Sequence, residues 1–264
     1  LIRHMILTSL RRYNVKFRDE YGPMILACDS TSWRKEKYPQ YKAKRKSSRE
    51  ESPLDWGKFF GFLNGIRDEI AAEMPYPVVH VDRAEADDVI GVLVESTQEF
   101  GQNEPVMIVS SDKDFIQLHR YSNVKQFSPM KRNFLKVDDP VYYKFEHICK
   151  GDVSDGVPNM LSADNTFSDG LRQTPLRTKR IQEWYNAYPN LCDEDVMTQE
   201  QYRNYCRNKL MIDLDCIPAD IQSNIMDKYK SQQGKKNMKV LNYLITKRCA
   251  LLVESAKDFF VNES

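Results

Sequence analysis

The sequence predicts an α/β fold, with a mostly parallel central sheet flanked by helices and a helical C-terminal domain. Three short apolar runs at 24–28, 77–81 and 106–110 are rich in Val, Ile or Leu, as is typical of buried strands. Helical patterns separate these runs, and strands that alternate with helices form parallel sheets. After about residue 139 the apolar spacing is that of helices. We therefore expect a sheet-based part followed by helices.

The first predicted helix lies between the first two strands. Its start signals are Ser52 as N-cap, Pro53 at the first helical position and Asp55 three residues after the cap. Its predicted inward face has helical spacing and consists of Phe59, Phe62, Leu63, Ile66 and Ile70. A second helix is predicted from about 84 to 100, with Val89, Val92, Leu93 and Phe100 facing inward. Residues 122–138 are expected to form one or two edge strands.

The second half of the chain carries further helix start signals. Helices are predicted to begin at Thr174-Pro175, at Thr198 with Gln201, and at Pro218, and a last helix is expected over 238–260. The polar, aperiodic residues 161–172 predict a loop. We predict an α/β domain at 1–138 and a helical domain at 139–264.

The composition excludes several classes of protein. No run approaches the roughly 20 apolar residues of a membrane span, and charges and Tyr interrupt every apolar run near the start, unlike a signal peptide. The six cysteines are scattered, and the four histidines do not cluster with one another. Reduced thiols in the cytoplasm are therefore expected. The net charge of +1 hides separate acidic and basic clusters, which matter to a polyanionic partner.

Acidic residues follow each of the three predicted strands. They are Asp29 after the first, Glu85, Asp87 and Asp88 after the second, and Asp112 and Asp114 after the third, and Asp152 and Asp155 open the helical half. Parallel strands deliver these carboxylates to one edge of a sheet. So many like charges share a site only if cations neutralise them. Oxygen ligands select Mg²⁺ or Mn²⁺, and two such ions can activate water and stabilise the leaving oxygen of a phosphodiester.

Helix capping is the alternative explanation for these acids. Glu85 lies three residues after Asp82, as in a capping box, Asp112 could cap the short helix that follows it, and Asp29 could belong to a turn. Capping alone seldom places acids after three successive core strands. We therefore favour the metal site.

A basic and aromatic segment follows the first acid, at residues 34–49. Lys and Arg neutralise phosphates, and aromatic rings stack on exposed bases. The predicted nucleic-acid-binding residues are Trp33, Arg34, Lys35, Tyr41, Lys42, Lys44 and Arg45. A solvated charged loop is the alternative. The position beside the carboxylates favours a segment that clamps a single strand.

Four strings of the sequence resemble a known family: DRAEADDVIGVLV, IVSSDKDFIQLH, NVKQFSPM and LMIDLDCIPADIQSNI. They are similar to the 5′-nuclease, or flap-endonuclease, family, in the ribonuclease H branch carried by T-even bacteriophages. The resemblance extends along the chain. It implies a 5′→3′ exonuclease and flap endonuclease that acts on RNA·DNA and DNA duplexes and removes RNA primers in lagging-strand replication.

The resemblance also implies roles for individual residues. Asp29, Glu85, Asp87, Asp112, Asp114 and Asp155 match the family's catalytic acids, with Asp88 and Asp152 as further metal ligands. Arg34 and Lys42 match basic residues of the arch through which the 5′ end passes. The segment GDVSDGVP matches the start of a duplex-binding motif, which makes 139–264 a duplex-binding domain. Implied partners are a phage single-stranded-DNA-binding protein and a sliding clamp, in the cytoplasm of the bacterial host, with no membrane.

The chain departs from the family pattern at its front. The family begins with a strand that carries an Asp, and nothing before Met24 matches it. We expect that this strand is missing from residues 1–264, and that this polypeptide binds flapped DNA but cleaves it poorly. The Gly-rich second half of the duplex-binding motif is not evident after Asn159.

Two other functions fit parts of the sequence. A PIN-like RNA endonuclease would share the acids, but such domains are shorter and lack a long helical tail. A non-catalytic protein that holds branched DNA would explain the basic segment and the absence of one acid. Mg²⁺-dependent cleavage of a 5′-flap substrate separates the second alternative from the nuclease.

Overall fold

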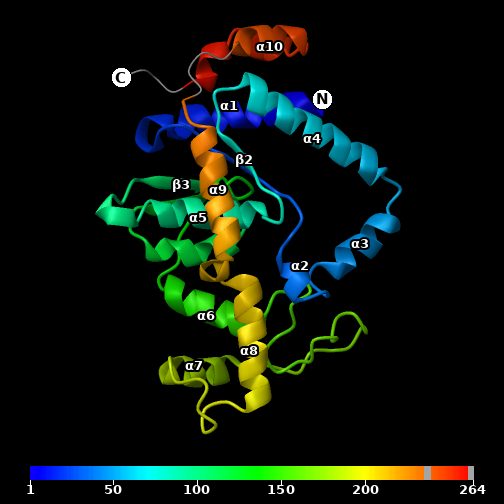
Figure 1. The fold of residues 1–264 in the computed structure, drawn as a ribbon, viewed down its shortest axis with the longest axis vertical. Coiled ribbons are helices and arrows are strands. Elements are labelled where there is room, and N and C mark those ends of the chain that lie inside the picture. Colours follow the sequence, from blue (N-terminus) through cyan, green and yellow to red (C-terminus); the bar gives the residue numbers. More distant parts are fainter. Residues whose placement is uncertain (235–238, 261–264) are drawn as a thin grey trace.

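The strands of the computed structural model, which describes residues 1–234 and 239–260, form two hydrogen-bonded sheets (Figure 1). β1 (Leu26–Cys28) pairs in parallel with β2 (Val78–His80), with Ala27 opposite Val79. β3 (Val106–Val109) pairs in parallel with β4 (Val124–Ser128), and β4 pairs antiparallel with β5 (Asn133–Leu135). The mostly parallel arrangement is confirmed. Residues 122–138 contain two strands, of which β5 lies at an edge as predicted, whereas β4 lies between β3 and β5.

The expectation of one sheet for the first three strands is wrong. β3 pairs with the segment that follows it rather than with β1 or β2. The short connection η2 (Asp114–Arg120) returns the chain beside β3, where β4 pairs with it. The acids still meet in space, because α5 (Ala86–Ser96) contacts both β1 and η2.

The helices of the first half surround these sheets. α1 (Ile2–Tyr21) contacts β3, and α4 (Trp56–Glu73) contacts β2. α5 is followed by the short η1 (Glu99–Gly101). The predicted second helix is thereby confirmed at its start, but it ends earlier than residue 100.

The predicted start and inward face of α4 need correction. The helix begins at Trp56, and its N-cap is Asp55, whose carboxylate accepts a hydrogen bond from the Lys58 N–H at 3.0 Å. Ser52 and Pro53 therefore lie before the helix. Ile66 and Ile70 are buried as predicted, whereas Phe62 is 42% exposed. The first turns of α4 extend away from the core and form an arch with α2 (Arg34–Lys37) and α3 (Ala43–Glu50) (Figure 1).

The second half is helical, as predicted. It contains α6 (Pro140–Lys150), α7 (Thr178–Ala187), α8 (Gln199–Ile212), η3 (Leu214–Cys216), α9 (Ala219–Ser231), α10 (Val240–Thr246), α11 (Ala250–Val253) and η4 (Ala256–Phe259). Thr198 and Gln201 form the predicted capping box of α8, and Pro218 precedes α9. The helix predicted at Thr174-Pro175 begins later, at Thr178, and residues 161–172 form turns. The predicted last helix is broken into three pieces, with Arg248 at a positive φ of 55° between two of them, and Met238 lies outside the described residues.

Buried residues gather into three cores. One core joins β2, α5 and β3 to Leu214, Ile217 and α9, and a second joins α6, α7 and α8 to Tyr38 and Tyr41. The third joins α1 and α4 to α10, α11 and η4. The last helices therefore pack on the first half of the chain, and the division at 138/139 stays a prediction. Within the described residues, we find no helix long and apolar enough to cross a bilayer.

Candidate active site

The end of β1 is tied to the start of α5. Asp29 follows β1, and its Oδ1 accepts a hydrogen bond from the Ala86 N–H at 2.8 Å. Glu85 is the N-cap residue of α5, and its own N–H donates to Asp88 Oδ2 at 2.9 Å. The capping explanation is therefore correct for Glu85, but its partner in the capping box is Asp88 rather than Asp82.

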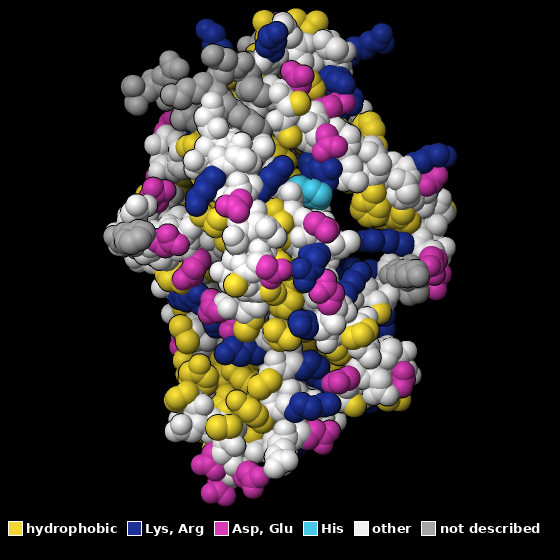
Figure 2. Space-filling view, in the orientation of Figure 1, with side chains coloured by type: hydrophobic (Ala, Val, Ile, Leu, Met, Phe, Trp, Pro, Cys, Tyr) yellow, Lys and Arg dark blue, Asp and Glu magenta, His cyan; other side chains and the backbone are white. Residues whose placement is uncertain are grey.

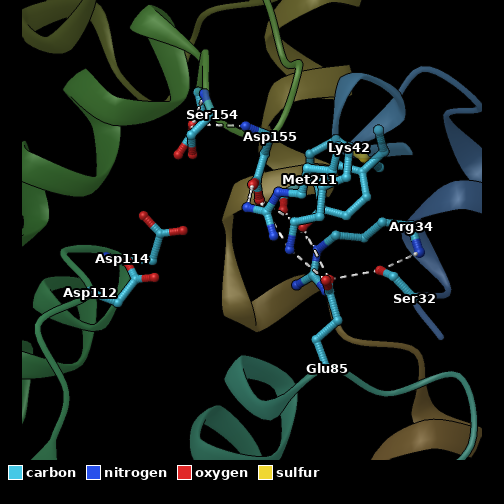
Figure 3. A network of polar contacts seen from close by, with 12 residues as sticks. Ser32, Arg34, Lys42, Glu85, Asp112, Asp114, Ser154, Asp155 and Met211 are labelled. Atoms are coloured by element: carbon cyan, nitrogen blue, oxygen red, sulfur yellow. Dashed lines mark hydrogen bonds and ion pairs between the residues drawn. The ribbon is translucent and has the colours of Figure 1, made fainter. Parts of the chain in front are cut away.

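Arg34 is a buried cation beneath this helix start. Its guanidinium lies 3.2 Å from Glu85 Oε2 and 2.8 Å from Asp88 Oδ1, and its Nε donates to the Met211 carbonyl at 2.8 Å (Figure 3). Asp88 is fully buried by these contacts. Its carboxylate is thus occupied by Arg34 and the helix N-terminus, and we remove Asp88 from the predicted metal ligands.

Lys42 connects Glu85 to Asp155. Its Nζ forms ion pairs with both carboxylates, at 3.3 Å from Asp155 Oδ2. The Tyr41 hydroxyl lies within hydrogen-bond distance of both, at 3.0 Å and 2.9 Å, and Arg45 pairs with Asp155 Oδ1 at 2.6 Å. Burial raises the pKa of Glu85, but the charge and hydrogen bond of Lys42, together with Ser32 and Arg34, outweigh it, so that this pKa lies below its usual value. These acids therefore carry negative charge that cations of the protein balance.

A second group of acids lacks such compensation. Burial, followed by the charge of Asp112, raises the pKa of Asp87 to about 7. Burial and then the charges of Asp112 and Asp152 raise the pKa of Asp114 to about 8. The Asp114 N–H donates to Asp112 Oδ1 at 3.0 Å, which places the two acids side by side (Figure 3). Like charges held together in this way favour a bound cation.

His147, on α6, lies beside this second group. Its Nε2 is 3.3 Å from Asp114 Oδ1 and 3.8 Å from Asp152 Oδ2, and one ligand atom from each residue lies within 4.8 Å of the others. This Nε2 is buried and has no hydrogen-bond partner among the described residues. Burial also lowers the pKa of His147, which favours the neutral imidazole that can ligate a metal.

The sequence reasoning missed His147. We searched for histidines that cluster with one another, and His147 lies alone. The available signal was its position five residues before Asp152. The structure places His147 in the last turn of α6, and the turn of the chain that follows brings Asp152 back beside it.

The turn that carries Asp152 and Asp155 depends on Gly151. This residue has a φ of 69°, and an added Cβ would lie 2.4 Å from the Val157 carbonyl oxygen. Asp152 Oδ1 accepts hydrogen bonds from the N–H groups of Ser154 and Asp155, at 2.7 Å and 3.1 Å. The turn thereby presents Asp155 to the arch and Asp152 to His147.

Several predicted nucleic-acid-binding residues are not on the surface. Trp33 and Tyr41 are 1% and 3% exposed, so neither ring can stack on a base, and Arg34 is 2% exposed. The prediction is wrong for these three because neighbouring acids and core side chains enclose them. Lys35, Lys44 and Arg45 are exposed, as a phosphate-binding role requires.

Comparisons with known proteins agree with this arrangement. A family model described as the 5′-3′ exonuclease, N-terminal resolvase-like domain matches residues 3–146, and one described as T4 RNase H, C terminal, matches residues 141–259. The ribonuclease H of Enterobacteria phage T4 is 34% identical over 269 residues, which cover 98% of this chain and 87% of that protein. The exonuclease of Escherichia phage T7 is 30% identical, over 64% of this chain and 54% of that protein.

Solved structures show the same fold. The flap endonuclease of bacteriophage T5, solved with DNA and metal ions, has a TM-score of 0.61 at 18% identity, and covers 86% of this chain and 91% of that one. The T5 5′-exonuclease with bound zinc has a TM-score of 0.56 at 19% identity, with coverage of 85% and 89%. The family models span both halves of the chain, and they match where the acids converge. The chain is thus a phage-type 5′ nuclease, a member of the 5′-3′ exonuclease family that includes the ribonuclease H of phage T4.

Proposed function

We propose that this protein hydrolyses phosphodiesters at the 5′ ends and flaps of RNA·DNA and DNA duplexes, and so removes RNA primers during phage lagging-strand replication. The observation that carries the proposal is the pair of buried carboxylates Asp87 and Asp114, whose pKa values are raised, beside Asp112, Asp152 and His147. Family membership supports the reaction class.

The cofactor proposed is Mg²⁺, as two ions, with Mn²⁺ as a substitute. The fit rests on the donor set, because carboxylate oxygens suit both ions. The raised pKa values of Asp87 and Asp114 indicate that the cations of the protein do not fully offset the burial of these carboxylates and their neighbouring acids. Asp87, Asp112, Asp114, Asp152 and His147 would hold one ion, and Asp29, Glu85 and Asp155 would complete the site. Such ions supply an activated water and charge stabilisation at the phosphate.

The basic residues of the arch have two functions in this proposal. Lys42 and Arg45 hold Asp155 and reach the site from the arch, so a scissile phosphate that enters would meet their charges. Lys35 and Lys44 face solvent and would contact the strand outside the site. Arg34 supports Glu85 from below and does not contact the strand.

Mg²⁺-dependent cleavage of a 5′-flap substrate tests the proposal. The protein should release short products from the 5′ end of flapped DNA and of RNA·DNA duplexes when Mg²⁺ is present, and none when a chelator is added. Binding of the same substrates without cleavage under any divalent cation would instead support the non-catalytic alternative. The PIN-like alternative loses its basis, because the helical half matches a 5′-nuclease model.

Two protein partners are also proposed, on the family resemblance alone. They are a phage single-stranded-DNA-binding protein and a sliding clamp, both of which act at replication forks. The place of action would be the cytoplasm of the infected host. Pull-down of each protein by this chain, with and without forked DNA, is the direct test.

The position of His147 predicts a nitrogen ligand in the metal site. Bound Mn²⁺ should show ¹⁴N coupling of a directly coordinated imidazole in pulsed electron paramagnetic resonance, and His147→Gln should abolish it. His119→Gln is the matched control, because His119 hydrogen-bonds to Gln126 at 3.0 Å and does not belong to this cluster. Affinity for Mn²⁺ should fall in His147→Gln and stay unchanged in His119→Gln, since only the first change removes a ligand. Bound Mn²⁺ without nitrogen coupling in the unmodified protein would exclude His147 as a ligand.

A further inference from the structure

Aromatic side chains project from the first turns of α4, outside the three buried cores. The rings of Trp56 and Phe60 are stacked, with centroids 5.7 Å apart and planes 30° apart, and Phe59 meets Trp56 edge-on at 5.8 Å. Phe60 is 37% exposed and Trp56 is half-buried. None of the three belongs to a core cluster. Exposed groups of large apolar side chains mark binding surfaces more often than chance.

A cation accompanies these rings. The Arg49 guanidinium lies 5.7 Å from the Trp56 centroid and 5.0 Å from the Phe60 centroid. Arg49 is exposed, and Lys44 and Arg45 are exposed on the same helix, α3. Rings beside Arg, on a positively charged surface, match the chemistry of single-stranded nucleic acid, which offers flat bases along a chain of phosphates.

The rings lie on the path that leads away from the acids. α3 begins directly after Lys42, which pairs with Glu85 and Asp155, and it ends just after Arg49. At about 1.5 Å of rise per residue, Arg49 is about 10 Å along the helix from Lys42. Hydrophobic side chains gather where α4 begins, beside an opening between the arch and the rest of the molecule, and Lys and Arg side chains border the same opening (Figures 1 and 2).

We propose that Trp56 and Phe60, with Arg49, form a base-stacking platform for the single-stranded 5′ segment of the substrate. The platform takes the role that the sequence suggested for Trp33 and Tyr41, which are buried. The proposal rests on the proposed function, because it names where the strand that reaches the acids is held. It also explains why an apolar cluster is kept on the arch and not in a core.

Tryptophan fluorescence tests the platform directly in the intact protein. The chain has three tryptophans, and Trp33 and Trp184 are each 1% exposed, so Trp56 is the one that a ligand can reach. A single-stranded oligothymidylate, added with a chelator present so that no cleavage occurs, should quench the emission. A strand of the same length with abasic sites carries the same phosphates but no bases, and should quench little. Equal quenching by both strands would overturn base stacking and leave a purely electrostatic contact.

Matched variants separate stacking from folding. Trp56→Leu and Phe60→Leu should each weaken oligothymidylate binding by about 5- to 150-fold, which corresponds to the loss of one base–aromatic stack. Trp56→Phe should keep most of the affinity while it removes the quenched emission. Phe62→Leu is the control. Phe62 is also exposed on α4, but it lies two positions after Phe60, on another face of the helix, where its ring contacts Arg3. Its loss should therefore not change strand binding.

The platform and the proposed hydrolytic function can fail independently of each other. If oligothymidylate affinity is the same in Trp56→Leu, Phe60→Leu and the unmodified protein, the platform is refuted, whether or not Mg²⁺-dependent flap cleavage is observed. If flap cleavage is absent but the bases quench Trp56, the platform stands and the hydrolytic proposal fails. If no strand quenches the Trp56 emission, the platform is also refuted, and a protein partner would be the alternative ligand of the aromatic cluster.

Discussion

Replacing Asp114 or Asp87 with Asn should lower Mg²⁺-dependent cleavage by about 100-fold or more, with substrate binding retained. In the proposed site these carboxylates hold the cation, and small misplacement of a reacting centre already costs about that much in rate. The exposed basic residues that would hold the strand, Lys35 and Lys44, are untouched by either change. Binding should strengthen slightly, because a negative charge near the phosphates is removed. Single-turnover cleavage and equilibrium binding of one flap substrate give both quantities.

The same substitutions should stabilise the metal-free protein. The pKa values of Asp114 and Asp87, at about 8 and about 7, lie above those of an unfolded chain. The folded state therefore binds more protons than the unfolded state between about pH 4 and the raised pKa values, so stability falls as pH rises through this window. The amide of Asn carries no charge, so these variants avoid the free-energy cost of ionising a buried carboxyl beside other acids. Thermal unfolding of the metal-free variants at pH 8 should show a higher Tm than the unmodified protein.

Asp138→Asn provides the control, because Asp138 is an exposed acid of the same chain outside the site. It should change neither cleavage nor the Tm appreciably. Unchanged turnover in both Asp114→Asn and Asp87→Asn would exclude these carboxylates from the reaction. A lower Tm in the metal-free variants would show that the acids are already paired in the folded protein, which contradicts the uncompensated charge on which the proposed site depends.

Arg34→Met should destabilise the protein by about 3–5 kcal/mol, the range found when one partner of a buried ion pair is removed. Arg34 is 2% exposed, and it balances Glu85 and Asp88, which are themselves buried. Without it Asp88 loses its cation, Glu85 keeps Lys42 alone as a cationic partner, and the Met211 carbonyl loses its donor. Urea-induced unfolding, followed by circular dichroism, measures the change in the free energy of unfolding.

Arg45→Met is the matched control for Arg34. Arg45 also pairs with an acid of the site, at 2.6 Å, but its side chain is 47% exposed. An exposed pair contributes about 0–1 kcal/mol, so this variant should remain close to the unmodified protein. Adding Asp88→Asn to Arg34→Met should recover part of the lost stability, because one unpaired charge is removed. Equal stability of Arg34→Met and Arg45→Met would show that Arg34 acts at the surface, as the sequence suggested, and not within the fold.

The sequence by itself determined the elements that depend on local pattern. Apolar runs predicted β1, β2 and β3 because a buried strand must be apolar over its few residues, whatever it pairs with. The capping box of α8 and the proline before α9 were recognisable because their contacts lie within one turn of the helix. The acids after each strand were recognisable from their positions in the sequence, but their convergence depends on α5, which contacts both β1 and η2.

Burial of charged and aromatic side chains was decided by the tertiary structure. Residues 34–49 have the composition of a solvated or phosphate-binding segment, and Lys35, Lys44 and Arg45 are indeed exposed. Arg34 and Tyr41 are buried because acids from the start of α5 and from the turn after Gly151 close around them. No local signal distinguishes these residues from their exposed neighbours, because the partners lie 44–114 positions away in sequence.

Proximity between distant segments likewise decided which residues form the site. His147 joins Asp114 and Asp152 because α6 contacts η2, a contact between elements that the sequence separates. Phe59 and Phe62 of α4 were predicted to face a core from their helical spacing, yet Phe62 is exposed and the first turns of that helix project into the arch. Helical spacing specifies which side chains share a face, whereas the packing of the whole chain specifies what that face meets. The acids could therefore be recognised from the sequence. Which cations, which imidazole and which aromatic rings lie beside them was decided by the packing of the whole chain.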